Sequence, residues 1–434
     1  MLPPRIFRRL ILGPLVILLT LAALVLSPLL VLIGLVASPS RSGRRRTLRL
    51  IWFGLTWLVM ESLALVACLG LWIASGFGGR LRSEASMDRH YALVRWFLAT
   101  LFRRAIIVFR LRVEIEEPEA TPEEQAARLT RPVIVLSRHA GPGDSFLLVH
   151  QLLSRYGRKP RIVMKAALQF DPSIDVVINR LPHAFVHPRQ PVPAPRPAVS
   201  AEVAGVAGPV DVSGPGAPVV AAVAPAATAV ASNEPIVPDE PRQPGDPTGP
   251  GPPMAPGVAT APGGAASHDA AVVREGSVIS EAAVIEEIRR LAAGLGPTGA
   301  LVIFPEGGNF TPSRWRRGVR RLVDAQRYPE AARASRMRNL LPPRSGGAFA
   351  AIDAAPTADV IFVAHTGLDD LITVGDVWRA LPMEQIIRAR WWRVPAADVP
   401  REREAVMRWL YDWWELIDAW IAENRPTRVP SPPA

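Results

Sequence analysis

The segment His139-Ala-Gly-Pro-Gly-Asp144 separates a predicted strand from a predicted helix and decides how the chain folds around these polar residues. The apolar run Pro132–Ser137 before it is typical of a buried strand, and Ser145–Gln151 after it opens an amphipathic helix. The Pro-Gly pair inside the segment predicts a tight connection between the two elements.

An imidazole and a carboxylate five positions apart at a strand exit form a possible catalytic pair. Asp144 can reach back from the helix start and hold one ring nitrogen of His139, which leaves the other nitrogen available as a base. No Ser or Cys completes a nucleophilic triad, so we expect the pair to activate a hydroxyl group of the substrate. The alternatives are a capping or core-edge histidine and a plain helix N-cap aspartate.

The His-x4-Asp spacing occurs a second time, at His365 and Asp370, again after an apolar strand, so the spacing alone is not specific. Only the first copy precedes a second motif, the segment Phe304-Pro-Glu-Gly-Gly-Asn-Phe-Thr311. It follows a predicted strand and precedes a basic helix.

The second motif is suited to holding an anion. Gly307 and Gly308 let the backbone approach a ligand and turn N–H groups towards it. The following helix presents its positive end to a phosphate, and Glu306 can bond a substrate hydroxyl or a neighbouring arginine. The alternative is an ordinary strand-to-helix turn that needs glycine for its shape.

Residues 1–83 contain two apolar stretches, Leu10–Ala37 with no charged residue and Leu50–Phe77 with only Glu61. Each exceeds the roughly 20 residues that cross a hydrocarbon core. A signal peptide is the alternative, but its apolar core is only about 7–15 residues long. We therefore expect an N-terminal membrane anchor.

The positive charges leave the topology of this anchor open. Arginines precede the first stretch and follow the second, yet five more stand between them. A hairpin with both ends in the cytoplasm places those five on the wrong side. Pro14 and Pro28 can break the first stretch into a re-entrant element, which would remove the conflict. We expect the active site to face the cytoplasm. The five intervening arginines are Arg41, Arg44, Arg45, Arg46 and Arg49.

Strand and helix patterns alternate over residues 84–188 and again over 271–425, which predicts one α/β domain in two parts. The expected fold is a mostly parallel central sheet flanked by helices. Predicted helices lie at 84–104, 145–156, 172–181, 280–293 and 401–423, and predicted strands at 109–116, 132–137, 161–166, 184–187, 300–304, 359–364 and 386–394.

Residues 189–270 interrupt the pattern, being rich in Pro, Ala and Gly and lacking any aromatic residue. Such a segment buries too little apolar surface to offset chain entropy, which predicts a disordered insertion. It is either a spacer or a docking site for a partner through its PxxP-like runs. Residues 426–434 are a predicted disordered tail.

The composition limits metal and redox chemistry. Cys68 is the single cysteine and lies in an apolar run, which excludes a disulfide framework and a cysteine-based metal site. The seven histidines lack zinc-site spacing, so we expect no metal.

The chain has a formal charge of +11, and Arg314–Arg344 alone holds ten arginines. A face this basic suits an anionic lipid leaflet, where each near-surface charge adds about 1 kcal/mol. No aromatic platform motif accompanies it, so we expect no nucleic-acid partner, and a solvated helix is the other alternative. Five tryptophans fit either the lipid interface or the core: Trp391, Trp392, Trp413, Trp414 and Trp420.

The two motifs, in this order and behind a membrane anchor, resemble the 1-acylglycerol-3-phosphate acyltransferase family of glycerolipid acyltransferases. His139 and Asp144 match its His-x4-Asp block, and Phe304–Gly307 match its Phe-Pro-Glu-Gly block. The resemblance covers residues 88–187 and 280–424. Further matching positions are Lys165, the segment Leu341-Pro-Pro-Arg344 and the helix from Trp409 to Trp420.

The resemblance implies transfer of an acyl chain from acyl-CoA or acyl-carrier protein to the free hydroxyl of a membrane-borne lysophosphatidic acid or related lysophospholipid. The product would be phosphatidic acid or another diacyl phospholipid, and no cofactor is implied. His139 would remove the hydroxyl proton, and Asp144 would fix the tautomer. Backbone donors near Gly141–Gly143 would stabilise the oxyanion. The expected substrate-binding residues are Glu306, Gly307, Gly308, Arg314, Arg317, Phe185 and Lys165.

This chain departs from the family pattern in two blocks. Asn309 stands where the family usually has an arginine for the substrate phosphate, so either Arg314, Arg316 or Arg317 substitutes or the acceptor is not a simple phosphate monoester. In the Gly-x-x-Phe-x-x-Arg block, Phe185 fits the Phe. The Gly position instead falls near Leu181 or Pro182, Arg189 falls one position late, and His187 can fill part of that role. A weakened scaffold that recruits partners through the insertion, and a lipid-binding protein without turnover, are therefore alternatives.

Overall fold

The computed structural model describes residues 3–36, 46–119, 121, 123, 130–186, 281–369, 371, 374–381 and 383–426. The predicted insertion at 189–270, the tail beyond residue 426, and Asp370, His187 and Arg189 lie outside the described residues.

A seven-stranded sheet in the order β1-β7-β6-β2-β5-β3-β4 organises the described chain. Strands β6, β2, β5, β3 and β4 run parallel, whereas β7 is antiparallel to β6 and β1 is parallel to β7. The predicted α/β fold with a mostly parallel sheet is therefore confirmed. The strands are β1 (Arg112–Glu116), β2 (Val133–Ser137), β3 (Lys159–Lys165), β4 (Ala184–Val186), β5 (Gly299–Ile303), β6 (Asp359–Thr366) and β7 (Ile386–Val394).

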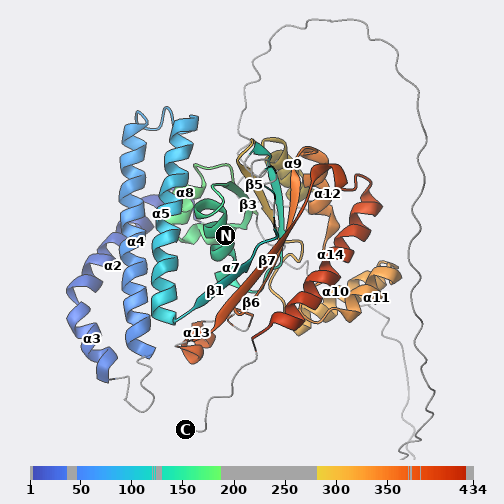
Figure 1. Ribbon diagram of the computed structural model, residues 1–434. Coiled ribbons are helices and arrows are strands. Elements are labelled where there is room, and N and C mark those ends of the chain that lie inside the picture. The colour runs from blue at the N-terminus through green and yellow to red at the C-terminus, as the bar shows by residue number, and fades with distance from the viewer. Residues whose placement is uncertain are drawn as a thin grey trace, which may run out of the picture. The chain divides into compact units, whose positions relative to one another are not determined.

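Helices cover both faces of the sheet (Figure 1). Successive side chains of β2 point to opposite faces. Ile134 and Leu136 join the main core with α9 (Glu281–Ala293), α12 (Ser345–Ala354) and α14 (Arg403–Asn424). On the other face, Val133 and Val135 pack with α7 (Pro142–Ser154). Strand β5 is apolar throughout and β2 up to its last residue, because both of their faces are buried.

The C-terminal tryptophans belong to the main core. Trp414 and Trp420 of α14 are buried there, and Phe362 of β6 stacks on Trp413 with ring centroids 4.5 Å apart. Trp392 packs against the same cluster, and Trp391 is buried on the opposite face of β7. Of the two expected locations, the structure places these rings in the core.

Two N-terminal helices, Arg5–Val25 and Arg46–Ala74, are long and apolar enough to cross a membrane. The first stretch is interrupted, as its prolines predicted: α2 (Gly13–Val25) ends before α3 (Ser27–Val36), which has Pro28 in its first turn. Pro14 does not interrupt the helix Arg5–Val25: the backbone stays helical through it, and a π-helical turn, Arg8–Leu12, directly precedes α2.

The second apolar helix, α4 (Arg46–Ala74), is held along its length by the α/β domain. At its start, Arg46 donates to the Leu381 carbonyl at 2.8 Å and Arg49 to the Val108 carbonyl at 2.5 Å. At its middle, Glu61 accepts the N–H and hydroxyl of Ser173, both at 2.8 Å. The prediction that Arg46 and Arg49 lie in a connecting loop was wrong, since both belong to the helix.

Several element boundaries differ from expectation, among them those of two helices. Helix α5 (Glu84–Phe109) continues past residue 104 and ends where Arg110 adopts a left-handed conformation with φ of 54°, so the next strand starts only at Arg112. Helix α7 begins at Pro142 rather than at Ser145. A proline at the first helical position is favourable, because its fixed φ suits the helix and its missing N–H has no helical acceptor.

Candidate active site

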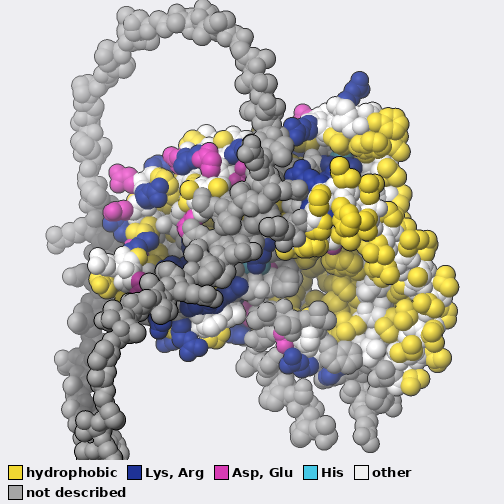
Figure 2. Space-filling model, turned by 180° about the vertical axis from the view of Figure 1, so that it is seen from behind, with side chains coloured by type: hydrophobic (Ala, Val, Ile, Leu, Met, Phe, Trp, Pro, Cys, Tyr) yellow, Lys and Arg dark blue, Asp and Glu magenta, His cyan; other side chains and the backbone are white. Residues whose placement is uncertain are grey.

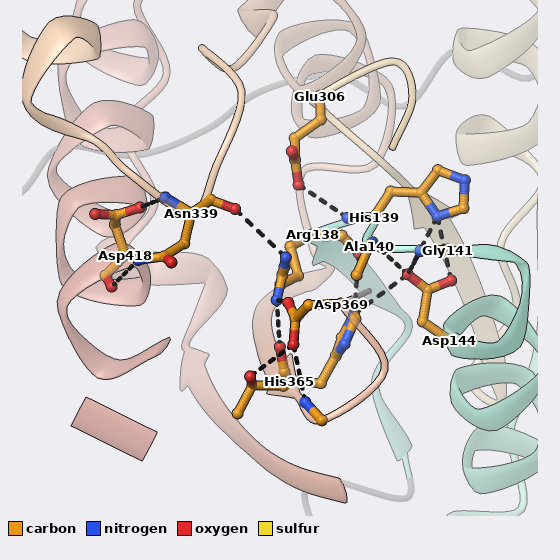
Figure 3. A network of polar contacts seen from close by, with 12 residues as sticks. Arg138, His139, Ala140, Gly141, Asp144, Glu306, Asn339, His365, Asp369 and Asp418 are labelled. Carbon is orange, nitrogen blue, oxygen red and sulfur yellow. Dashed lines mark hydrogen bonds and ion pairs between the residues drawn. The ribbon is translucent and has the colours of Figure 1, made fainter. Parts of the chain in front are cut away.

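His139 and Asp144 meet at the carboxyl end of β2, as the sequence predicted. Nδ1 of His139 lies 3.2 Å and 3.3 Å from the two carboxylate oxygens of Asp144. The second ring nitrogen is on the side of the ring away from Asp144 (Figure 3). The imidazole keeps 17% of its side chain exposed, whereas Asp144 is buried. A carboxylate at Nδ1 places the proton there and leaves Nε2 as the basic nitrogen.

Backbone groups fix the Asp144 carboxylate. Oδ2 accepts the N–H of Ala140 at 2.5 Å and of Gly141 at 3.0 Å, and the hydroxyl of Ser145 donates to Oδ1 at 3.1 Å. Burial raises the pKa of Asp144, but the hydrogen bonds from His139 and from the Gly141 amide, together with the electrostatic effect of the neighbouring His365 and His139 rings, outweigh it and lower the pKa to about 2. Asp144 is therefore a carboxylate at neutral pH.

This geometry rules out one alternative and corrects one expectation for the turn. Asp144 is the third residue of α7 and Gly141 the N-cap, so Asp144 is not itself the N-cap. The Gly141 amide is also bound to the Asp144 carboxylate. It is therefore unavailable to an oxyanion, contrary to the prediction for this part of the Gly141–Gly143 backbone.

The second motif lies directly against the first. Glu306, in the loop after β5, accepts the backbone N–H of His139 at 2.8 Å and that of Leu341 at 2.9 Å. The N–H of Phe310 donates to the His139 carbonyl at 3.3 Å, and the Phe304 ring lies 4.8 Å from the imidazole. The second motif thus binds both the N–H and the carbonyl group of His139.

Glu306 has a different role from the one expected. It is buried, and each of its carboxylate oxygens is engaged by a backbone N–H, so it braces two loops instead of reaching outward to a ligand. Burial raises the pKa of Glu306 to about 7, against the lowering effect of the Arg138 charge and of the two N–H donors. The sequence could not distinguish these roles, because a carboxylate after a strand serves either.

Gly307 and Gly308 form a turn beneath two arginine side chains. Gly307 has φ of 68°, a conformation that favours glycine. A Cβ there would lie 3.2–3.4 Å from the guanidinium of Arg344, and one at Gly308 would meet that of Arg314. Arg314, at the start of α10 (Pro312–Asp324), also donates to the Asn309 carbonyl at 3.3 Å. Two exposed guanidinium groups thus lie over the glycine turn.

The other predicted binding residues are more distant along the sheet edge. Lys165 ends β3 and is exposed, and Phe185 is half-buried in β4. Both strands continue the parallel order beyond β5, so their ends share the edge that carries His139 and Glu306. Arg317 bonds the Ser313 carbonyl of its own helix at 3.4 Å. No described contact joins Lys165, Phe185 or Arg317 to the His139–Asp144 pair.

Sequence reasoning missed a buried network behind the pair (Figure 3). Arg138 donates to Asp369 at 2.5 Å and to the His365 carbonyl at 2.7 Å. It also contacts the Asn339 carbonyl, at 3.4 Å, in a loop whose N–H groups Asp418 of α14 accepts. The available signal was an arginine directly after an apolar run and before His139, since an arginine that such a strand end buries needs partners.

A cavity of about 360 Å³ lies between α7 and the sheet. Its walls are largely apolar, with Val135 and Val363 from the sheet and Leu148 from α7, and Asp144 and His365 also line it. Among the described residues, no group of three or more His, Cys, Asp or Glu side chains is arranged to hold a metal ion.

Comparison with known proteins adds no relative. No family model matches the chain, and neither a curated protein nor a solved structure matches it.

Proposed function

We propose that this protein is a membrane-bound O-acyltransferase that moves an acyl chain from an acyl thioester to the free hydroxyl of a lysophospholipid. The observation that carries the proposal is the His139–Asp144 pair, with Nδ1 held at 3.2 Å by a buried carboxylate and Nε2 turned outward. Such a pair removes a proton from a hydroxyl group as that group attacks a carbonyl carbon.

In the proposed reaction, Nε2 of His139 takes the hydroxyl proton, and the acceptor oxygen bonds to the thioester carbonyl carbon. The resulting imidazolium is stabilised by Asp144. The tetrahedral intermediate collapses with cleavage of the carbon–sulfur bond, and the proton passes to the leaving thiolate. No enzyme-bound acyl group is needed, because the acceptor supplies the nucleophile.

The arginines over the glycine turn support a phosphate-bearing acceptor. Arg344 and Arg314 present planar guanidinium groups, which bind phosphate oxygens in pairs. Their turn belongs to the loop that clamps the His139 backbone. A phosphate bound there places the rest of a small lysolipid headgroup near the imidazole. In this proposal Arg344 shares with Arg314 the role that the sequence offered to Arg314, Arg316 or Arg317.

The N-terminal helices support a lipid-borne substrate. Large apolar side chains are exposed along α2, α3 and α4, and Figure 2 shows a broad hydrophobic surface on this side of the molecule. Exposed apolar area of this extent marks a membrane or protein contact. The opposite side of α4 is tied to the α/β domain through Glu61 and Ser173. We therefore favour helices that lie embedded in one leaflet over a hairpin that crosses both. The residues of this surface include Leu18, Leu21, Leu24, Leu29, Leu32, Val66, Leu69 and Ile73.

The direct test uses purified full-length protein in phospholipid vesicles with labelled acyl-CoA, acyl-carrier protein as an alternative donor, and a panel of lysophospholipids. We expect a labelled diacyl phospholipid from wild type and none from His139→Ala. A His150→Ala variant is the matched control, because His150 lies on α7 and contacts Phe102 and Ser154 but neither residue of the pair. Equal product from wild type and His139→Ala would overturn the proposal. In the scaffold alternative, deleting residues 191–266 abolishes function while His139→Ala has no effect.

A further inference from the structure

His365 occupies a position that the proposed chemistry has not yet used. Strand β6 lies beside β2, with Val363 paired to Ser137, so the ends of the two strands are neighbours. His365 follows two residues later on the same face as Val363 and points to the first turn of α7. The histidine of the second His-x4-Asp match therefore lies beside the first match.

The imidazole of His365 faces two acceptors. Its Nε2 lies 3.3 Å from the carbonyl oxygen of Arg138 and 3.6 Å from Oδ2 of Asp144. Because both are acceptors, Nε2 carries the proton. Burial lowers the pKa of His365, against the charge of Asp144, so the ring approaches the carboxylate as a neutral N–H donor.

The two histidines lie next to different oxygens of the Asp144 carboxylate. Oδ1 faces Nδ1 of His139, and Oδ2 faces Nε2 of His365 together with the amides of Ala140 and Gly141. Oδ2 accepts its hydrogen bonds from the two backbone amides, and Nε2 of His365, at 3.6 Å, adds an electrostatic contact to the same oxygen rather than a further hydrogen bond. Beyond His365 lies the apolar cavity, where a shortened side chain would leave room for water beside Oδ2.

The backbone that carries His365 is itself fixed. Its carbonyl accepts a hydrogen bond from Arg138. Another partner of Arg138, Asp369, accepts the hydroxyl of Thr366 at 2.7 Å and the N–H of Gly367 at 2.9 Å. The buried network in Figure 3 thus ends at this imidazole. Because its backbone is fixed, the His365 ring presents Nε2 to Asp144 from one direction.

We propose that His365 is a positioning residue: from β6 it orients the Asp144 carboxylate so that His139 keeps its proton on Nδ1 and has an unprotonated Nε2. The purpose of this positioning rests on the proposed function. His365 touches no substrate atom in this role. It acts through Asp144.

The test uses full-length protein, labelled with ¹⁵N-histidine, in detergent micelles. His365→Gln keeps an N–H donor near the position of Nε2, and His365→Leu removes it. Val363→Ala is the matched control, because Val363 is on the same face of β6 and lines the same cavity. The ring nitrogens of His139, assigned with His139→Gln, report its tautomer directly.

We expect the Nδ1–H tautomer of His139 to dominate in wild type, His365→Gln and Val363→Ala, and to become a mixture in His365→Leu. In the acyl-transfer assay, kcat of His365→Leu falls about 10-fold, because the carboxylate loses a polar N–H at 3.6 Å but keeps its two backbone donors. KM stays within about twofold, because no substrate contact is lost.

An unchanged tautomer in His365→Leu would overturn the proposal, and so would an equal change in Val363→Ala. If His365→Leu does not fold, His365→Asn replaces it, since its amide is too short to reach Oδ2 and the same mixture is expected. The spectra decide this inference even if wild type transfers no acyl group, a result that would sink only the proposed function.

Discussion

Two strand ends in this molecule carry a histidine followed by an aspartate, and they do different things. After β2, the next helix starts at once, and its third residue, Asp144, turns back to His139. After β6, a loop follows, and Asp369 turns away from His365 to Arg138. The side chain of His139 is 17% exposed and that of His365 only 6%. The role of each histidine thus depends on whether the following element places a carboxylate against its ring. It also depends on whether the second ring nitrogen reaches solvent.

We expect the largest effect from removing the more exposed histidine, His139. In His139→Ala, kcat for acyl transfer should fall about 10²- to 10⁴-fold, the usual contribution of a positioned base. The melting temperature should stay near that of wild type, because the ring is partly exposed and its clamps are backbone groups. Initial rates and thermal melts on the same preparation measure both. Full activity would remove His139 from the chemistry.

At the end of β6, a substitution should change the free energy of unfolding. Asp369→Ala leaves the buried Arg138 guanidinium without its carboxylate, which costs about 3–5 kcal/mol for a broken buried ion pair. Urea unfolding of the full-length protein measures the loss. Asp412→Ala is the control, because Asp412 is 65% exposed in its ion pair with Arg333 and should cost about 1 kcal/mol or less. Equal losses of unfolding free energy in the two variants would show that the buried Arg138–Asp369 pair does not stabilise the fold more than an exposed ion pair does.

The shared carboxylate should give a pH-dependent effect. The pKa of Asp144 is lowered from 3.8 to about 2, so its ionisation adds stability that is present above about pH 4 and is lost as the pH falls towards 2. At pH 7, Asp144→Asn should therefore cost about 2 kcal/mol. Unfolding free energies of wild type and variant at pH 7, 4 and 3 should converge as the pH falls. A difference that is independent of pH would contradict this assignment.

The smallest expected effect concerns the glycine turn opposite His139. Gly307→Ala places a side chain at φ of 68° and crowds Arg344, which costs about 1–2 kcal/mol for the backbone alone. Displacement of Arg344 should raise KM for phosphate-bearing acceptors more than it lowers kcat. Gly296→Ala is the matched control, because nothing lies within 4 Å of its added Cβ. Steady-state rates with lysophosphatidic acid and with an uncharged monoacylglycerol separate the two effects.

Much of the fold followed from local pattern. The boundaries of β7 were predicted to the residue, and those of β2 and β5 within one residue at each end. For β2 and β5 the reason is that an apolar run between turn residues predicts a strand well when both faces of the strand are buried. The start of α7 was missed because proline signals both a turn and a first helical position. The end of α5 was missed because its last residues resemble the alternating strand that follows.

The candidate site was only partly accessible to the same reasoning. The His139–Asp144 contact is local and followed from spacing alone. Glu306 was given an outward role, although its carboxylate is turned inward to two backbone groups. Arg344 was matched to the family pattern without a role, because it reaches the glycine turn from a loop 37 positions later in the chain.

By itself, the sequence determined the alternation of strands and helices, the apolar N-terminal segment and the pair at residues 139 and 144, since each depends on neighbours within a few positions. Only the tertiary structure decided that a second imidazole, from a strand more than 200 positions later, comes within 3.6 Å of the same carboxylate. The physical reason is strand pairing: β6 was placed beside β2 by hydrogen bonds and by burial on both faces, and no local pattern encodes which strand becomes the neighbour.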